Sequence, residues 1–533
     1  MNEDLDDARV VIVGAGPVGQ TGALLLARWG VPVTLLDPRP SRDLVGSKAI
    51  CQQRDVLDVW DTVGAGQLAQ EGLTWTTART FHRDIELFAQ QFQDRGRSPF
   101  PPFVNVSQSR SEQVLDEQIA QQPLIDVRWG HEVVGLEQDE HSVTITCRTD
   151  AGTVVLTSPY VLACPGARGD TVRRMLGLSF EGRTFGDQFL ICDIRTELPG
   201  WEHERRFYFD PEWNPGRQVL IHPCPDSTYR IDWQVPPSFD LDEDERTGAL
   251  DARIRQIVGG RPYEIVWKSV YRFHSRVVDR MRVGRVLLAG DVAHLVSPFG
   301  ARGLNSGVLD AENAAWKLAF VLRGWAGEEL LESYHAERHA AALENLDVTG
   351  ATMRFLVPQD PDEHEARLSV LRRARTDAAA RALVDSGRLA EPFWYVDSPL
   401  TTPDPSRPFL GRPPKGEAPA PAPGVLLPDC PVTVPGRPDV TRLRLLLRGG
   451  VTLLAGSDVD LDLLEQAVAS SAAPTQVWCA ADLEPALPDV LGLRPDEVWI
   501  VRPDAHAAAI VPSTATVPAL SRLIAQPVPV AAV

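Results

Sequence analysis

Several features are scarce or missing in this sequence of 533 residues. Lysine stands only at positions 48, 268, 317 and 415, so almost every positive charge is an arginine. Acidic side chains outnumber basic ones, and the net charge of −19 argues against a general nucleic-acid binder and against binding to an anionic membrane surface. No stretch approaches the roughly 18 apolar residues of a membrane-spanning helix. The acidic start, MNEDLDD, does not resemble a signal peptide.

The cysteines are also few and scattered. Their number, seven, is odd, and no two of them form a C-x-x-C pair. We therefore expect neither a disulfide scaffold nor a zinc site, and we predict a reducing, cytoplasmic location and no bound metal. The cysteines are Cys51, Cys147, Cys164, Cys192, Cys224, Cys430 and Cys479.

A glycine-rich turn joins a predicted strand to a predicted helix in the stretch ARVVIVGAGPVGQTGALLLARWG. In its G-x-G-x-x-G pattern, Gly14 makes the tight turn, Gly16 lets a phosphate approach the backbone, and Gly19 lets helix and strand pack closely. Asp37 ends the next predicted strand, where a carboxylate can bind ribose hydroxyls. The pattern predicts dinucleotide binding. Asp37 favours a ribose without a 2′-phosphate, although the nearby Arg39 weakens that preference.

A second glycine loop lies in GRVLLAGDVAHLVSPFGARGLNSGVLDAENAAWKLA, residues 284–319. Gly290 and Asp291 end a predicted buried strand, and Pro298 precedes a predicted helix. Asp291 is placed to accept a hydrogen bond from a sugar-type hydroxyl. The backbone N–H groups of residues 303–305 are placed to meet a phosphate or an electron-rich ring oxygen. The plain alternative is a Gly-Asp turn and a capped helix that serve only the fold.

The middle of the chain changes character. Short alternating segments predict an antiparallel sheet between about residues 187 and 273. Upstream, Ser109 and Glu112 predict a capping box at the start of a helix. Downstream, helical patterns lead to a proline-rich stretch, 401–424, that is typical of a linker, and a small α/β pattern follows. The predicted strands of the middle region are Gln188–Arg195, Arg206–Phe209, Gln218–His222 and Tyr229–Val235.

Three motifs carry a resemblance to a known family. VVIVGAGPVG…LLD, LACPGARGDTVRRMLG and the second glycine loop occur in the order and at the separations seen in the single-component FAD-dependent aromatic hydroxylases, which include p-hydroxybenzoate and 3-(3-hydroxyphenyl)propionate hydroxylases. The resemblance covers about residues 9–340, and the Gly-Asp loop with DAENAAWKL is its most specific part. Larger members of the family carry a C-terminal thioredoxin-like domain without redox cysteines, and EVWIVRPDAHAA resembles its last strand.

The resemblance implies an α/β fold with three parts. These are a Rossmann-like FAD-binding domain, an inserted antiparallel-sheet substrate domain and a C-terminal thioredoxin-like α/β domain. Because the C-terminal part has no dithiol, we expect a structural or oligomeric role for it. The expected division is 1–180 and 276–400 for the FAD-binding domain with a helical segment, 181–275 for the substrate sheet, 401–424 for the linker, and 425–533 for the thioredoxin-like domain without C-x-x-C.

The resemblance also implies a reaction. NADH or NADPH reduces the bound FAD, and the reduced flavin captures O2 as a C4a-hydroperoxide that hydroxylates a phenolic or polyketide-type aromatic. The site must exclude water and help the substrate hydroxyl lose its proton. Two other functions stay open: a flavoprotein oxidase or epoxidase of a non-phenolic substrate, and a catalytically weakened flavin- or ligand-binding protein. We expect a small aromatic substrate and O2 as partners, no nucleic acid or membrane, and a homodimer as one candidate assembly.

The resemblance further implies a set of FAD contacts. The first glycine turn meets the pyrophosphate, and Asp37 meets the adenosine ribose. Lys48 stands where the family often has an arginine near the pyrophosphate. Gln108 matches a glutamine near the ribityl chain, and Val133 matches a backbone position near the adenine. The full expected set is Gly14, Gly16, Val18, Gly19, Asp37, Arg39, Lys48, Gln108, Val133, Gly166, Gly290, Asp291, Pro298, Gly303, Leu304 and Asn305.

One motif departs from the family. Family members usually have Asp-Gly-Ala-Arg-Ser in the loop after the third strand, and the Asp-Gly pair is linked to FAD and NAD(P)H binding. Here Pro165 replaces that aspartate and supplies neither a carboxylate nor an N–H group. Three interpretations stay open: the proline preserves the turn and the lost contact is tolerated, Asp170 substitutes for it, or the use of NAD(P)H is impaired.

The substrate side offers three candidates for relaying the phenol proton. They are His222, Tyr271 and His274, in VLIHPCPDSTYRIDW and VYRFHSRVVDRM. Each has a plain alternative, because a histidine on a strand more often lies at the surface or the core edge and a tyrosine more often packs. The catalytic residue therefore stays open from the sequence.

Overall fold

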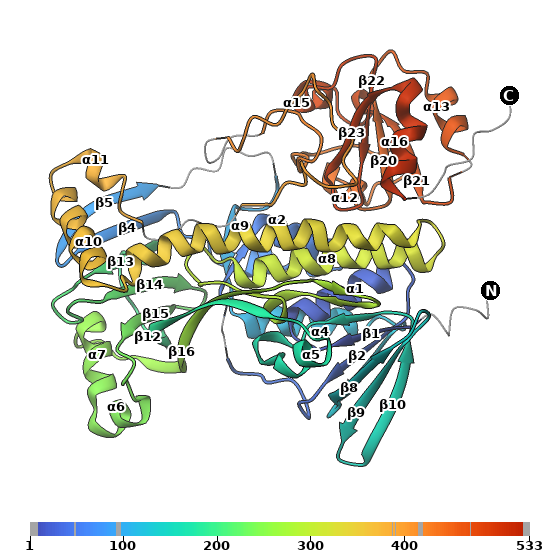
Figure 1. Cartoon of the computed structure of the whole chain (residues 1–533). Coiled ribbons are helices and arrows are strands. Elements are labelled where there is room, and N and C mark those ends of the chain that lie inside the picture. The colour runs from blue at the N-terminus through green and yellow to red at the C-terminus, as the bar shows by residue number, and fades with distance from the viewer. Residues whose placement is uncertain are drawn as a thin grey trace.

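The computed structural model describes residues 9–46, 49–91, 98–385, 387, 389, 391–413, 419–469 and 471–525. Two long helices, α8 and α9, cross the middle of the molecule, as Figure 1 shows. Below them lie a parallel sheet and a larger antiparallel sheet, and above them lies the C-terminal domain. The α/β fold class expected from the sequence is confirmed.

A mostly parallel sheet forms the core of the first domain. Within the described part of the chain its strand order is β17-β18-β11-β1-β2-β7. Strands β1, β11 and β18 are parallel neighbours, so the loops that follow them emerge at one edge of the sheet. The strands are β1 (Val10–Val13), β2 (Val33–Asp37), β7 (Ile125–Trp129), β11 (Val161–Ala163), β17 (Arg282–Val283) and β18 (Val286–Leu288).

Short elements and a twisted hairpin surround this sheet. Strands β9 and β10 form the hairpin and pair antiparallel, from Val143 opposite Ser158 to Thr149 opposite Gly152. The predicted capping box is wrong: Ser107, not Ser109, caps α4 by accepting a hydrogen bond from the N–H of Arg110. The elements are α1 (Pro17–Arg28), β3 (Cys51–Gln53), α2 (Arg54–Asp61), α3 (Leu68–Glu71), β6 (Phe103–Asn105), α4 (Gln108–Ile119), β8 (Glu132–Gln138), β9 (Val143–Thr149), β10 (Gly152–Ser158), η2 (Gly166–Arg168) and α5 (Asp170–Met175).

The larger sheet joins strands from distant parts of the chain. Its order among the described residues is β19-β16-β12-β15-β14-β13-β4-β5. The division of domains at residue 181 is too simple, because β4 and β5 come from the first part of the chain and β4 pairs with β13. The strands are β4 (Thr77–His82), β5 (Ile85–Gln91), β12 (Phe180–Arg195), β13 (Glu204–Phe209), β14 (Gln218–Cys224), β15 (Thr228–Val235), β16 (Glu264–Val278) and β19 (His294–Leu295).

The two faces of this sheet differ. One face buries aliphatic side chains such as Ile231 and Val219 against α7 (Ala249–Val258), which follows α6 (Leu241–Thr247). The other face carries the aromatic rings of Phe189 and Phe207 together with buried polar groups. Because side chains alternate along a strand, each strand contributes to both faces. The aromatic face is the one that contacts Phe299, a residue of the second glycine loop.

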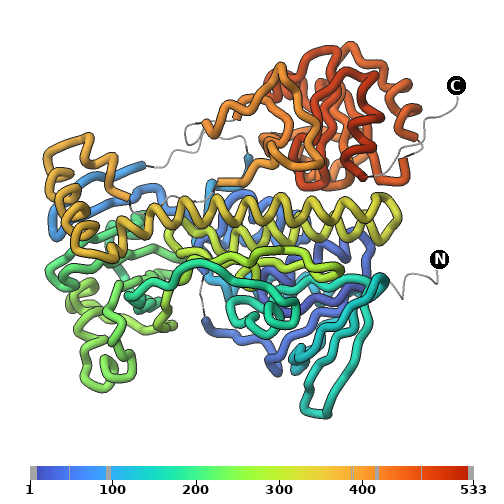
Figure 2. The backbone as a smooth tube through the Cα atoms, in the orientation of Figure 1, coloured from blue at the N-terminus to red at the C-terminus, as the bar shows by residue number. Residues whose placement is uncertain are grey.

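Helices connect these sheets to the C-terminal domain. Figure 2 shows the yellow segment of the backbone passing between the lower body and the orange-to-red domain above it. The elements of this segment are η3 (Gly290–Val292), α8 (Gly303–Leu322), η4 (Glu328–Leu331), α9 (Glu332–Leu356), α10 (Pro361–Ala374) and α11 (Ala378–Arg381).

The C-terminal sheet domain expected from the sequence is present, and its likeness to thioredoxin stays a prediction. The strand order is β21-β20-β22-β23, with β20 and β21 parallel and the other pairs antiparallel. The elements are α12 (Leu443–Leu447), β20 (Val451–Ala455), α13 (Leu461–Val468), β21 (Thr475–Cys479), α14 (Ala480–Leu483), α15 (Leu487–Leu491), β22 (Glu497–Val501), β23 (Ala507–Pro512), η5 (Ser513–Ala515) and α16 (Thr516–Leu523).

The described ends of the proline-rich stretch do not behave as a free linker. The N–H of Thr402 donates to the carbonyl of Ala508, and the N–H of Gly424 donates to that of Ala507. Gly424 also accepts from the N–H of Tyr395. Backbone hydrogen bonds therefore fix both ends of this stretch against the C-terminal sheet, which composition alone does not reveal.

Two buried ionic clusters join the C-terminal domain to the rest of the chain. In the Asp58 cluster, the carboxylate of Asp58 on α2 contacts Arg442 and Arg448, and Arg448 also contacts Glu312 on α8 at 2.7 Å. In the Glu337 cluster, defined by Lys317, Glu337, Arg502 and Asp504, Glu337 on α9 pairs with Arg502 at 2.6 Å and with Lys317 at 2.6 Å.

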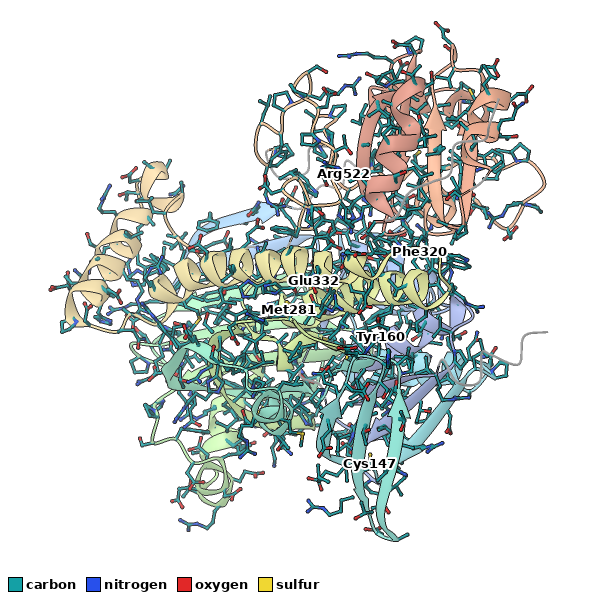
Figure 3. All side chains as sticks on the ribbon, turned by 45° about the vertical axis from the view of Figure 1, so that its right-hand side comes forward. Cys147, Tyr160, Met281, Phe320, Glu332 and Arg522 are labelled. Carbon is teal, nitrogen blue, oxygen red and sulfur yellow. The ribbon has the colours of Figure 1, made fainter. Side chains whose placement is uncertain are left out.

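An apolar contact lies beside these clusters. Phe320 of α8, labelled in Figure 3, lies at the boundary between the helix and the C-terminal domain. Its ring packs edge-on against Trp29 and Trp316, and the same cluster includes Leu453 of β20. The C-terminal domain is therefore held on α8 and α9 by both buried charge and apolar packing.

We expect Glu337→Gln to lower the free energy of unfolding by about 3–5 kcal/mol, because it leaves the buried charges of Lys317 and Arg502 without their partner. Glu365→Gln is the matched control, since Glu365 pairs with Arg372 at the surface and we expect a change below about 1 kcal/mol. Chemical denaturation measures both. Equal stability of the two variants would show that the Glu337 cluster does not hold the domains together.

Candidate functional site

Three loops meet at the edge of the parallel sheet. They follow β1, β11 and β18, and their backbones are in close contact. A Cβ atom on Gly14 would lie 2.3 Å from the carbonyl oxygen of Cys164, and one on Gly19 would lie 1.9 Å from that of Gly14. A Cβ on Gly307 of α8 would lie 3.1 Å from Cα of Gly290 and 2.7 Å from a methyl of Val18. Glycine at these positions is what lets the loops form one continuous surface.

A buried carboxylate on α8 holds the second glycine loop. The side chain of Asp310 accepts hydrogen bonds from the N–H of Gly290 at 3.0 Å and from Nε of Arg338 at 2.7 Å, and it lies 2.6 Å from Nε2 of His294. Burial raises the pKa of Asp310, but the charges of His294 and Arg338 outweigh burial and lower the pKa to about 2. Asp310 is therefore an anion that ties together η3, β19, α8 and α9.

The backbone leaves room for a ligand at two helix starts. The N-caps of α1 and α8, Gly16 and Arg302, make no side-chain capping bond. A Cβ on Gly16 or on Gly166 would meet nothing within 4 Å, and one on Gly303 would meet only a methyl of Val296 at 3.8 Å. Uncapped, open helix N-termini bind anions and electron-rich oxygens. The residues present therefore fit FAD, with its pyrophosphate at α1 and a flavin ring edge at α8.

Asp37 lies at the end of β2, beside the first of these helix starts. Its carboxylate accepts from the N–H of Ala15 at 2.9 Å and from Nε of Arg39 at 2.8 Å. Burial raises the pKa of Asp37, but the hydrogen bonds from Arg39 and Ala15 outweigh it and lower the pKa. Asp37 is thus a fixed anion next to the turn, with Arg39 as its companion. Their role in binding the ribose stays a prediction.

Sequence reasoning missed Arg42. Its guanidinium is nearly buried, donates to the carbonyl of Ala15 at 2.6 Å and pairs with Asp116 of α4 at 2.7 Å. The carbonyl of Ala15 belongs to the glycine turn, so Arg42 brings a second positive charge beside Arg39 to the predicted pyrophosphate position. Both partners of Arg42 are distant in sequence, and no local pattern identifies it.

The other predicted cofactor residues take different positions. Oε1 of Gln108 accepts from the N–H of Ala49 at 3.2 Å. Val133 is buried in β8, next to the first domain's core. The side chain of Asn305 accepts from the N–H of Gln53 at 2.9 Å and donates to the carbonyl of Cys51, so only its backbone is left to meet a ligand. Lys48 lies outside the described residues.

The Pro165 loop is held by packing and by an arginine. A Cβ on Gly169 would lie 3.0 Å from the ring of Pro165 and 2.5 Å from Val292 of η3, so the loop fits tightly against the second glycine loop. Arg173 of α5 is buried and donates to the carbonyl of Val292 at 3.0 Å. Asp170 is exposed and pairs with Arg173, so it does not point into the site as a substitute carboxylate.

The aromatic face of the larger sheet lies against the loop that precedes α8. The rings of Phe189 and Phe273 stack at 4.3 Å, and Phe299 packs edge-on against both, at 5.6 and 5.9 Å. Burial, with a smaller contribution from the carboxylate of Asp291, raises the pKa of Tyr271 to about 12. Tyr271 is thus a neutral phenol close to Asp291, and the wall that it shares with Phe273 faces the second helix start.

The three candidates for the proton relay lie on different faces of the larger sheet. Tyr271 and His222 lie on the aromatic face, where His222 follows Leu220 at a spacing of two along β14. His274 follows Phe273 directly in β16, so it points to the opposite side, and its Nδ1 lies 3.0 Å from Oγ1 of Thr184. Whether any of the three moves a proton stays a prediction.

The described residues contain no candidate metal site and no candidate membrane-spanning helix. No group of three or more His, Cys, Asp or Glu side chains in this part of the chain could hold a metal ion. No helix in the same residues is both long and apolar enough to cross a membrane.

Comparison with known proteins places this geometry among flavin-binding proteins. Residues 7–349 match the family described as FAD binding domain. The chain is 30% identical over 376 residues to 3-(3-hydroxy-phenyl)propionate/3-hydroxycinnamic acid hydroxylase of Comamonas testosteroni, a match that covers 69% of this chain and 62% of that protein. The chain thus spans less than two thirds of the length of this curated relative.

Two solved structures resemble nearly the whole chain. The flavin-dependent monooxygenase PieE, solved in complex with FAD and substrate, superposes with a TM-score of 0.84 at 25% identity, over 98% of this chain and all of that one. The OxyS anhydrotetracycline hydroxylase from Streptomyces rimosus superposes with a TM-score of 0.69 at 26% identity, over 97% of this chain and all of that one. The likeness therefore includes the C-terminal domain.

Proposed function

The chain belongs to the FAD binding domain family, and from this premise we propose that it is a flavin monooxygenase that uses NADH or NADPH and O2 to hydroxylate a phenolic or polyketide-type aromatic. One observation carries the proposal: the uncapped start of α8, fixed by Asp310, faces the aromatic side of the larger sheet. A flavin edge at this helix would lie against a wall suited to an aromatic ring.

Bound FAD would supply the redox chemistry and the activation of O2. The chain's own residues bind, orient and exclude water. The N–H groups at the start of α1 would hold the pyrophosphate, with Arg42 nearby as a counter-charge. Asp37 would accept from the adenosine ribose, and the backbone of residues 303–305 would meet the pyrimidine edge of the flavin.

The substrate class follows from the wall and from the relatives. Phe189, Phe207 and Phe273 offer stacking and edge contacts to an aromatic ring, and buried polar groups beside them offer hydrogen bonds to its substituents. The name of one relative contains a hydroxyphenyl compound, and that of the other contains anhydrotetracycline. The hydroxyphenyl name and the aromatic wall together favour a phenolic ring in the substrate.

The other candidate functions have less support. Nothing among the described residues favours an oxidase or epoxidase of a non-phenolic substrate. A weakened ligand-binding protein was suggested by Pro165, yet Arg173 and tight packing keep that loop in place. We propose a structural role for the C-terminal domain, supported by its two ionic clusters. The cysteines form no disulfide, which supports a reducing, cytoplasmic location, and the homodimer stays a prediction.

We expect the purified protein to bind FAD and to oxidise NADH or NADPH faster when a phenol is present, with a hydroxylated product. Absorption spectra of the flavin, nicotinamide oxidation with a panel of phenols and product analysis test each step. A protein that takes up no FAD contradicts the proposal entirely. A flavoprotein that no phenol stimulates and that forms no hydroxylated product contradicts the substrate class.

Pro165→Asp restores the carboxylate of the family motif, and we expect it to speed flavin reduction or to tighten NAD(P)H binding. The physical reason is that a carboxylate at the start of η2 offers an acceptor that proline lacks. Anaerobic stopped-flow reduction with NADH and NADPH measures the effect, with Pro165→Ala as the control for loss of the ring. Unchanged reduction by the aspartate variant would show that the missing carboxylate has no consequence.

A further inference from the structure

A buried carboxylate oxygen on the aromatic face has no hydrogen-bond partner among the described residues. Asp232 of β15 is opposite Leu220 of β14 and Ile191 of β12, in the row of side chains that face the second glycine loop. Among the described residues, no donor reaches its Oδ1 atom, which is buried. The residue as a whole keeps intermediate exposure. A buried acceptor without a partner is costly, and its presence calls for a ligand or a functional role.

The neighbouring charges explain why Asp232 is not simply part of an ion pair. Arg230, two residues along the strand, makes a two-pronged pair with Asp193 of β12, at 2.7 and 2.8 Å. Arg205 of β13 is buried on the same face. Burial raises the pKa of Asp232, Arg230 and Arg205 lower it, Asp193 raises it, and the result is about 7. Asp232 can therefore both hold and release a proton near neutral pH.

Two further groups of β14, His222 and Cys224, lie on the same face of the sheet as Asp232. His222 is opposite Arg230 in the sheet, and its buried Nδ1 makes no hydrogen bond within the described residues. Burial and the charges of Arg205 and Arg230 hold the pKa of His222 well below its usual value, so its imidazole is neutral. Burial raises the pKa of the Cys224 thiol to about 12, so this group is neutral as well.

The polar side chains of Asp232, Arg205 and His222 are connected through aromatic rings to the start of α8. The guanidinium of Arg205 lies 5.4 Å from the ring of Phe207 and 6.0 Å from that of Trp75. Trp75 packs in one small cluster with Phe103 and Ala301, and Ala301 is two residues before α8. The rings of Trp75 and His222 are 6.3 Å apart. Asp232 and His222 therefore belong to the wall that faces the proposed flavin edge.

We propose that Asp232 is the catalytic residue that accepts the proton of the substrate's phenolic hydroxyl, with the neutral imidazole of His222 as a second hydrogen-bonding group for the substrate. In this step the substrate O–H bond breaks, an O–H bond forms on the carboxylate of Asp232, and the electron pair stays on the phenolate oxygen. No oxidant is needed for this step. The inference rests on the proposed function, because it takes the substrate to be a phenol. A phenolate ring is the better carbon nucleophile for hydroxylation.

The assignment has a consequence for binding that can be measured without turnover. The ionised carboxylate accepts a hydrogen bond from a phenol but not from the matching methyl ether. Below about pH 7 Asp232 is protonated and loses this role. The preference for the phenol should therefore rise with pH through the neutral range. Arg230, Arg205, His222 and Cys224 stay in one ionisation state over that range, because the pKa of each lies outside it.

The test compares 2-naphthol with 2-methoxynaphthalene as probes of the FAD-loaded, oxidised protein. Calorimetry at about pH 6 and about pH 8 gives the two dissociation constants. We expect the wild type to bind the naphthol about tenfold more tightly than the ether at the higher pH, and to lose most of this preference at the lower pH. Asp232→Asn should show a ratio of about threefold or less that does not change with pH. Asp226→Asn, in the exposed turn of the same hairpin, should behave as the wild type.

Thermal melting shows whether Asp232→Asn folds. A carboxyl group whose pKa is raised in the folded state contributes stability below that pKa, which is lost as the pH rises. The asparagine variant should therefore melt at or above the wild-type temperature at about pH 8. A lower melting temperature would contradict the assignment of a raised pKa.

Several outcomes overturn the assignment. They are a wild type that binds both probes equally or binds neither, and an asparagine variant that keeps the wild-type ratio and its pH dependence. The proposed function is judged separately, by FAD uptake and by phenol-stimulated nicotinamide oxidation in the same wild-type preparation. If that activity is present while the asparagine variant keeps its phenol preference, the monooxygenase proposal stands and another residue takes the proton.

Discussion

The buried carboxylate of Asp310 is the interaction on which the site depends. It accepts from the backbone of Gly290 and from Arg338, and it lies beside His294. Through these contacts one side chain of α8 sets the position of the second glycine loop, of α9 and of the short strand next to the larger sheet. Phe299, in the loop that leads into α8, then meets the aromatic wall. Removing His294 or Arg338 would leave the buried charge of Asp310 without part of its compensation, which is costly and therefore favours this one arrangement.

The same helix explains why the C-terminal domain is attached where it is. The first turn of α8 faces the proposed flavin edge, and its later turns carry Glu312 and Lys317 into the two interdomain clusters. Phe320 adds an apolar contact at the boundary. The C-terminal domain thus stabilises helix α8, the element that positions the proposed reaction site. Its two cysteines, Cys430 and Cys479, form no disulfide, so the attachment relies on ion pairs and packing.

Much of the fold could be predicted, because those signals are local. The glycine turn and the Gly-Asp loop each fit a short pattern and lie at the ends of buried strands. The alternating strands of the middle region are present, although β12 begins at Phe180, eight residues before its predicted start. Other features depend on distant contacts. Arg42 meets Asp116 across the site, and β4 joins a sheet built mainly from later strands. Local rules also misled: the capping-box pattern selected Ser109, while the cap is Ser107.

We propose that open backbone at the first helix start receives the phosphates of FAD. The most direct test is the FAD dissociation constant of Gly16→Ala. Gly16 has φ −77° and open space around its missing Cβ, so alanine should lower the stability of the cofactor-free protein by no more than about 1 kcal/mol. We expect FAD binding to weaken about tenfold or more. Gly19→Ala, whose Cβ would collide with Gly14, should instead damage the fold. Wild-type FAD affinity in a folded Gly16→Ala variant would contradict the account.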